Sequence, residues 1–191
     1  MHDNYWLWLI IGLSIGAFIA WLVFGGKLKV TKEGFEVEIE GVLGYLREAA
    51  KRKGTVKPDE VMVRRELYAI RRKLPTLKVL WVDDNPTWNL FERLAFASAG
   101  VFIDSYTNNG DAISVLEAGG FELVISDLNR TGKTETGWEL LNELRRLRPK
   151  MPFVFYVSHI DDEIRERVQK LGADITNDPA QLVQLVLTHV R

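Results

Sequence analysis

The sequence contains no cysteine among its 191 residues. This absence excludes a disulfide scaffold and a zinc site built from thiolates. An excess of charge is also missing, because the formal net charge is −1, so overall charge points to no particular partner. Internal repeats and low-complexity tracts are absent as well. The length is enough for one domain with additional segments.

Charge is unevenly distributed along the chain. Residues 27–76 hold 13 Lys and Arg against 8 Asp and Glu, whereas residues 77–191 hold 12 against 17. A basic middle followed by an acidic C-terminal part indicates two different environments. We therefore divide the chain into a transmembrane anchor at 1–26, a basic hairpin and helical connector at 27–76, and a folded domain at 77–191.

The anchor is predicted from twenty uncharged residues at 5–24. A helix of that length spans roughly 30 Å, the thickness of a bilayer core, and aromatic residues stand at both of its ends. A cleaved signal peptide would need basic residues before the apolar run, and none is present. A buried helix of a soluble domain is the alternative. Lysines follow the run, so the positive-inside rule predicts a single-pass protein of the inner (cytoplasmic) membrane with its C-terminal domain in the cytoplasm.

Two features of the N-terminal half suggest further structure. Gly12 and Gly16 form a small-residue face through which two membrane helices could approach, giving a homodimer. In the connector, apolar residues alternate over 27–40 around Gly34, which predicts a small β-hairpin. Two helices are expected after it, at 41–53 and 59–74.

The second connector helix carries an apolar stripe at four-three-four spacing, with arginines outside it. Such a stripe could form a coiled-coil seam, and the basic face could contact anionic lipid. We favour a helix packed on its own domain with a solvated basic face. No nucleic-acid partner is expected, because the basic residues lie next to the predicted membrane segment. The stripe consists of Val63, Leu67, Ile70 and Leu74.

From residue 77 onward, short apolar runs alternate with helical patterns five times. Five such units predict an α/β fold, a doubly wound parallel sheet with helices on both faces. The expected strands are 77–82, 101–105, 121–126, 153–157 and 173–176. The expected helices are 87–99, 109–118, 137–148, 161–171 and 179–190.

Carboxylates close two of the predicted strands. Asp83 and Asp84 follow the first strand and Asp127 follows the third. Because the C-terminal strand ends of an open α/β sheet form its ligand crevice, these acids should converge there. They would repel one another unless a hard cation such as Mg²⁺ lay among them. The alternative is that Asp84 or Asn85 caps the next helix and Asp127 caps a turn.

Several motifs in this order resemble the receiver domain of bacterial two-component response regulators. They are Val-Leu-Trp-Val-Asp-Asp-Asn-Pro, Leu-Val-Ile-Ser-Asp-Leu-Asn, Val-Ser after the fourth strand and Gly-Ala-Asp before the fifth. The resemblance covers residues 77–191. It implies a flavodoxin-like (βα)5 sheet with strand order 2-1-3-4-5, and a sensor kinase or another signalling protein as partner.

The resemblance also implies roles for individual residues. Asp127 would be the phosphoryl acceptor, and Ser158 would be the switch hydroxyl that bonds the phosphoryl group after transfer. Asp83, Asp84 and Asp127 would hold Mg²⁺ together with the backbone carbonyl of Asn129. A weak carboxylate nucleophile needs such a metal to neutralise and align the incoming phosphoryl oxygens.

The sequence departs from the family pattern in two places. Asp178, instead of lysine, precedes Pro179 after the fifth strand, and the loop after Asp127 lacks the usual Met-Pro. Arg130 or Lys133 could supply the missing cation.

Three functions follow from these patterns. The first is a membrane-anchored phosphorelay module that accepts a phosphoryl group at Asp127 with Mg²⁺, and is therefore not an enzyme. The second is a pseudo-receiver, an adaptor that binds proteins independently of phosphorylation. The third is a metal-dependent phosphohydrolase, for which no suitably placed general base is evident; His159 is more simply a surface residue.

Overall fold

The computed structural model describes residues 32–130 and 136–189. The predicted membrane segment at 5–24, the Gly12 and Gly16 face and Lys133 lie outside these residues. Among the helices of the described part, none is both long and apolar enough to cross a bilayer. Residues 36–191 form one compact unit, so the greater part of the connector and the C-terminal α/β fold pack together.

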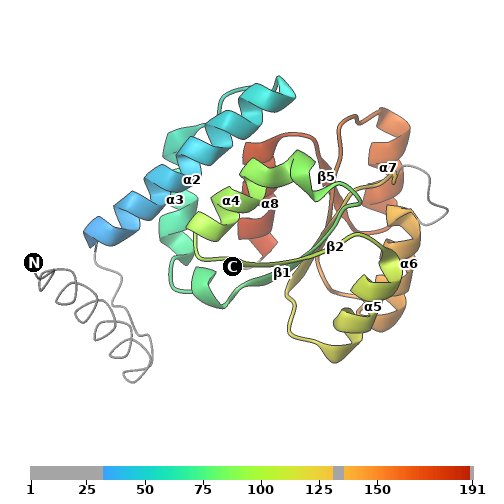
Figure 1. The fold of residues 1–191 in the computed structure, drawn as a ribbon. Helices are drawn as coiled ribbons and strands as arrows, with labels where there is room; N and C mark the ends of the chain where they lie inside the picture. The colour runs from blue at the N-terminus through green and yellow to red at the C-terminus, as the bar shows by residue number, and fades with distance from the viewer. Residues whose placement is uncertain (1–31, 131–135, 190–191) are drawn as a thin grey trace, which may run out of the picture. The chain divides into compact units, whose positions relative to one another are not determined.

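A five-stranded sheet lies at the centre of this unit (Figure 1). All of its strand pairs are parallel, and the order is β2-β1-β3-β4-β5, as predicted. The end of β1 is aligned with the end of β3, where Val82 pairs with Ser126. The strands are β1 (Lys78–Val82), β2 (Phe102–Tyr106), β3 (Leu123–Ser126), β4 (Phe153–Tyr156) and β5 (Asp174–Thr176).

Side chains from successive strand residues enter two apolar layers, because they point to opposite faces of the sheet. Leu80 and Val82 belong to a core shared with Leu140 and Leu144 of α6 (Gly137–Leu147). On the other face, Trp81 meets Phe96 of α4 (Leu90–Ser98) edge to face, with ring centroids 6.3 Å apart. Burial on both faces explains why the strands are nearly continuous apolar runs.

A helix follows every strand, and most of the observed helix bounds lie within one or two residues of the predicted ones. Figure 1 shows α4 and α8 on one face of the sheet and α5 and α6 on the other. A 3₁₀ turn, η2 (Pro86–Asn89), precedes α4 and accounts for the late start of that helix. The remaining helices are α4 (Leu90–Ser98), α5 (Asn109–Ala118), α7 (Asp162–Lys170) and α8 (Pro179–His189).

The predicted hairpin over 27–40 is wrong for its described part. Residues 32–53 form one helix, α2 (Lys32–Lys53), which includes Gly34. The alternation that suggested strands was misleading, because the middle residue, Val37, is 73% exposed. The buried positions instead recur at helical spacing, which continues through the segment predicted as a helix. They are Phe35, Ile39, Val42, Leu43, Leu46, Ala49 and Ala50.

Helix α3 (Glu60–Ile70) packs against α8, and a 3₁₀ turn, η1 (Leu74–Thr76), connects it to β1. All four residues of its predicted stripe are buried, which supports packing on its own domain. Asp59 caps the helix by accepting a hydrogen bond from the Met62 amide. The apolar stripe is therefore covered within the chain, and only part of the arginine face meets solvent.

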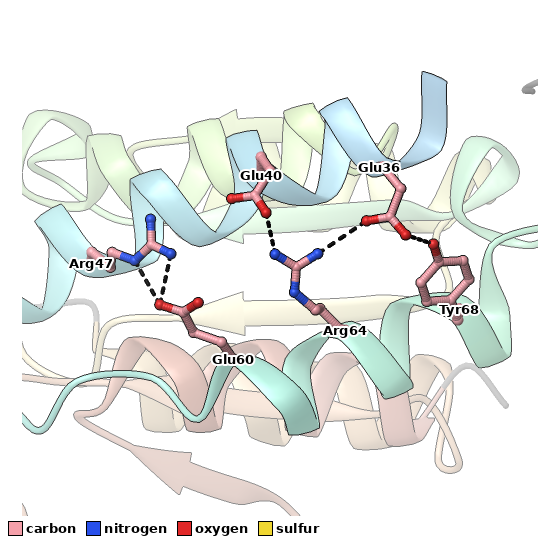
Figure 2. Close-up of polar contacts among 6 residues, drawn as sticks. All are labelled: Glu36, Glu40, Arg47, Glu60, Arg64 and Tyr68. Atoms are coloured by element: carbon pink, nitrogen blue, oxygen red, sulfur yellow. Dashed lines mark hydrogen bonds and ion pairs between the residues drawn. The ribbon is translucent and has the colours of Figure 1, made fainter. Parts of the chain in front are cut away.

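Polar contacts join α2 to α3 along their length (Figure 2). Arg64 of α3 forms ion pairs with Glu36 and Glu40 of α2, and the Tyr68 hydroxyl donates to Glu36. One turn away, Arg47 pairs with Glu60 at 2.7 Å. These groups are partly exposed, so each pair contributes about 1 kcal/mol or less. The contacts fix the register of the two helices more than they stabilise the fold.

The helical character of α2 can be tested with two residues that a hairpin would place on one face. Ile39→Ala should lower the free energy of unfolding by about 2–4 kcal/mol, because it empties a buried site. Val37→Ala should change it by less than about 0.5 kcal/mol, because the side chain is exposed. Urea unfolding followed by circular dichroism measures both. Equal losses for the two variants would contradict the helix.

Candidate functional site

An open cleft of about 510 Å³ lies at the carboxyl ends of the strands. The aligned ends of β1 and β3 bring their acids to one place, and Asp83, Asp84 and Asp127 all line this cleft. Asn129 and Ser158 line it too. The structure thus gathers all five site residues that the sequence predicts.

Asp83 is held firmly at the end of β1. Its amide donates to the Tyr106 carbonyl at 2.9 Å, and its carboxylate accepts hydrogen bonds from the Asn85 amide and from Asn89. Only 8% of Asp83 is exposed, and burial raises the pKa of its carboxyl, against the opposing effect of the Asn85 hydrogen bond. Asn89, a buried residue of η2, is a site residue that sequence reasoning missed.

Asp127 extends the sheet ladder by donating its amide to the Val82 carbonyl at 3.0 Å. Its Oδ1 accepts from the Leu128 amide at 2.7 Å, so the residue makes the local turn contact of the capping alternative and also lines the cleft. Burial raises the pKa of the Asp127 carboxyl to about 6. The charges of Asp83 and Asp84 add to this rise, while backbone hydrogen bonds oppose it.

Gly137 is a second residue that the sequence analysis did not single out. It is the first residue of α6, and its amide donates to the Leu128 carbonyl at 2.9 Å. A Cβ at this position would lie 2.4 Å from the Asp127 carbonyl oxygen and 2.7 Å from the Phe155 ring. Only glycine therefore lets α6 begin against the backbone of Asp127. The Thr-x-x-Glu capping box starting at Thr136 was a readable signal for this helix start.

Three exposed side chains form part of the cleft wall. Ser158 and His159 follow β4, and Trp88 stands on η2 with 63% of its surface exposed. Ser158 has the position that the resemblance implies for the switch hydroxyl. His159 is an exposed residue, as expected, and it shares this wall with Ser158.

The capping alternative fails for Asn85, whose side chain makes no cap hydrogen bond to η2. Asp178, which the capping alternative did not include, does cap a helix. The Asp178 Oδ1 accepts from the Gln181 amide at 2.8 Å in the first turn of α8. This local role explains an acid before Pro179, because carboxylates stabilise helix N-termini.

Arg130 does not replace the missing cation in this arrangement. It is 4% exposed, and its guanidinium donates to the Asn109 side chain and, at 2.8 Å, to the Ser126 hydroxyl. These bonds tie the loop after β3 to the start of α5. The positive charge of Arg130 still opposes the rise in the pKa of Asp83 that burial causes.

A group from α2 reaches the same cleft, and no local sequence signal indicates it. Lys53 lines the cleft, and its Nζ lies 4.1 Å from the centroid of the Tyr156 ring and 3.9 Å from Glu92 Oε1. The Tyr156 hydroxyl donates to Glu92 at 2.6 Å. Glu92 is 1% exposed, so its buried carboxylate needs both the Lys53 charge and the Tyr156 hydrogen bond to offset the loss of water.

The donor set fits Mg²⁺. Carboxylate oxygens of three acids face one cleft, and their mutual repulsion contributes to the raised pKa of Asp127. Within residues 32–130 and 136–189, no three His, Cys, Asp or Glu side chains are arranged to hold a metal ion by themselves. Mg²⁺ does not require such a cage, because it keeps several waters and takes one or two carboxylates.

The doubly wound sheet and its acidic cleft place the chain in the flavodoxin-like class of α/β folds. A family model, the response regulator receiver domain, matches residues 79–177, which is just over half of the chain. The chain belongs to this family. It is accordingly a non-enzymatic signalling module of two-component systems, so the prediction that the protein is not an enzyme is confirmed. Membership of the family implies an interaction with a sensor kinase.

Solved structures share the fold. The chemotaxis protein CheY4 of Vibrio cholerae is 20% identical, with TM-score 0.53, over 59% of this chain and 98% of that one. A response regulator of Clostridium difficile is 19% identical, with TM-score 0.54, over 60% and 96%. TrrA of Thermotoga maritima, solved in complex with Mg²⁺-BeF, is 20% identical, with TM-score 0.51, over 59% and 98%. None of the curated proteins compared with the chain matches it.

The raised pKa of Asp127 predicts how stability depends on pH. The folded pKa of about 6 lies above the unfolded value of about 3.9, so the metal-free protein loses stability as pH rises from about 4 to 6. Asp127→Asn removes this loss. Because Asp127 is only half-buried, the variant should be about 1 kcal/mol more stable than wild type at pH 7.5.

Urea unfolding without divalent cations at pH 4.5 and 7.5 measures this difference, which should fall to about one third at the lower pH, where only the unfolded carboxyl is largely ionised. Ser114→Ala, at an exposed position of α5 without an ionisable group, is the control and should change stability equally at both pH values. A constant difference at both pH values would contradict the assigned pKa.

Proposed function

We propose that this receiver module accepts a phosphoryl group on Asp127 in a Mg²⁺-dependent reaction. The observation that carries the proposal is the single cleft that Asp127 shares with Asp83, Asp84 and Ser158. A carboxylate oxygen of Asp127 attacks the phosphorus of the donor. The bond from phosphorus to the donor breaks, and its electron pair leaves with the donor. The product is an acyl phosphate on Asp127.

The other residues have separate roles in this proposal. Asp83, Asp84, Asp127 and the Asn129 carbonyl would hold Mg²⁺, which neutralises the phosphoryl oxygens and aligns the attack when it is bound. The hydrogen bonds from Asn85 and Asn89 orient the Asp83 carboxylate at the cleft, and the Asn85 bond opposes the rise in its pKa that burial causes. Ser158, exposed on the cleft wall, donates to a phosphoryl oxygen after transfer.

An adaptor that binds partners without phosphorylation is the second candidate. The observations in its favour are that an acid, Asp178, stands where the family has its lysine and caps α8, and that Arg130 is bound to Asn109 and Ser126 and does not supply the missing cation. Lys133, the other candidate, lies outside the described residues. Family membership argues against a phosphohydrolase, because the receiver domain is a non-enzymatic signalling module.

Intact-protein mass spectrometry with a small acyl phosphate separates the two candidates. Wild type with Mg²⁺ should gain the mass of one phosphoryl group, and Asp127→Asn should gain none. Omitting Mg²⁺ should slow the reaction by at least about 100-fold, given the electrostatic share of such catalysis. Asp111→Asn is the control and should react like wild type. Absence of transfer with excess donor and Mg²⁺ would favour the adaptor.

We also propose that the module is anchored in the inner membrane by the uncharged segment at 5–24, with its folded unit in the cytoplasm. The support is the length of this segment, its aromatic ends and the lysines that follow it. A homodimer through Gly12 and Gly16 belongs to the same proposal. The anchor would hold the acceptor near a sensor kinase at the membrane.

Cell fractionation and protease protection test the anchor. The full chain should remain with the membrane after washing in high salt and at alkaline pH, whereas a chain starting at Gly34 should be released. In intact cells, external protease should leave the folded unit uncut. Cleavage of the unit from outside, or mature protein starting near residue 26, would contradict the topology.

A further inference from the structure

The end of α2 is fixed beside the acceptor cleft. Gly54 follows Lys53 with a φ of +67°, a left-handed conformation that commonly ends helices. The Thr55 amide donates to the Ala50 carbonyl at 3.0 Å and closes the last turn. Lys51 and Arg52 are exposed, whereas the Lys53 side chain is 21% exposed and lines the cleft. The helix therefore presents one cation of its basic last turn to the site.

The Lys53 ammonium group is positioned by the charge of Glu92 and by the Tyr156 ring, without a direct hydrogen bond to either. The distance from its Nζ to Glu92 Oε1, 3.9 Å, is longer than a hydrogen bond, and the Tyr156 hydroxyl donates to the same oxygen. The Tyr156 ring contributes a cation–π contact at 4.1 Å. An ammonium has three donors, so Lys53 keeps donors available for a further anion.

The charges around Lys53 include the acids of the site. Burial lowers the pKa of Lys53, while the charges of Glu92, Asp83 and Asp127 raise it. Of the Lys and Arg residues that the structure describes, Lys53 alone lines the cleft. A phosphoryl group on Asp127 would add roughly −2 of charge beside two further carboxylates, so it requires cations within reach.

We propose that Lys53 binds the phosphoryl oxygens of phosphorylated Asp127. This inference rests on the proposed phosphorylation, and it places the required cation on α2, outside the matched residues 79–177. Glu92 and Tyr156 then act as positioning residues that hold the ammonium near the cleft before transfer. The last turn of α2 becomes part of the phosphoryl site.

Beryllofluoride, a mimic of the phosphoryl group, tests this role in the full chain. Lys53→Gln should weaken beryllofluoride binding by about 10-fold or more at saturating Mg²⁺, because a hydrogen bond to a charged group is lost. The same variant should bind Mg²⁺ alone as tightly as wild type or a few-fold more tightly, because a repelling charge is gone. Fluorescence of Trp88, which lines the cleft, reports both titrations.

These different effects distinguish a lysine that binds the anion from one that only supports the fold, because misfolding would weaken the affinities for both beryllofluoride and Mg²⁺. Lys53→Arg should recover most of the beryllofluoride affinity, and Lys51→Gln, an exposed neighbour, should leave both affinities unchanged. Equal beryllofluoride affinity in wild type and Lys53→Gln would overturn the role of Lys53 alone. If wild type itself bound no beryllofluoride while still binding Mg²⁺, the proposed phosphorylation and the role of Lys53 would both fail.

Discussion

Repulsion among carboxylates is the constraint around which the site is organised. The register of β1 and β3 brings Asp83 and Asp127 to one edge of the sheet, where burial makes their charges costly. Much of the surrounding structure offsets that cost with donors and cations. The Asn89 side chain and the Asn85 amide donate hydrogen bonds to Asp83, and the Leu128 amide donates one to Asp127. Lys53 brings a positive charge.

The helices outside the matched family region contribute to this balance. Helix α3 packs on α8, and α2 is joined to α3 by the ion pairs of Arg64 and Arg47. This packing fixes where the end of α2 lies relative to the cleft. Because Gly54 stops the helix at that point, Lys53 falls at the cleft while Arg52 reaches the Thr87 carbonyl on η2. A segment that began as a connector in the sequence is thus structurally part of the site.

The sequence predicted the sheet and the acids well because both signals are local. A strand buried on both faces must be an apolar run, and an acid at its end is visible by position alone. The hairpin prediction failed because Phe35, Val37 and Ile39 also fit a helix in which Val37 meets solvent. The Lys53–Glu92 contact could not be predicted, because it joins residues from distant helices and depends on the packing of both. Gly137 could have been found from the capping box that contains it, but its close approach to Asp127 required coordinates.

The length of α2 has a structural consequence. From Glu36 to Lys53 one continuous helix covers roughly 25 Å. Lys53 at the cleft and Glu36 at the Arg64 and Tyr68 contacts therefore belong to the same element. The exposed ion pairs contribute little to its stability, so α2 is held mainly by its buried apolar face. A single helix thus joins the carboxyl ends of the strands to the N-terminal end of the folded unit.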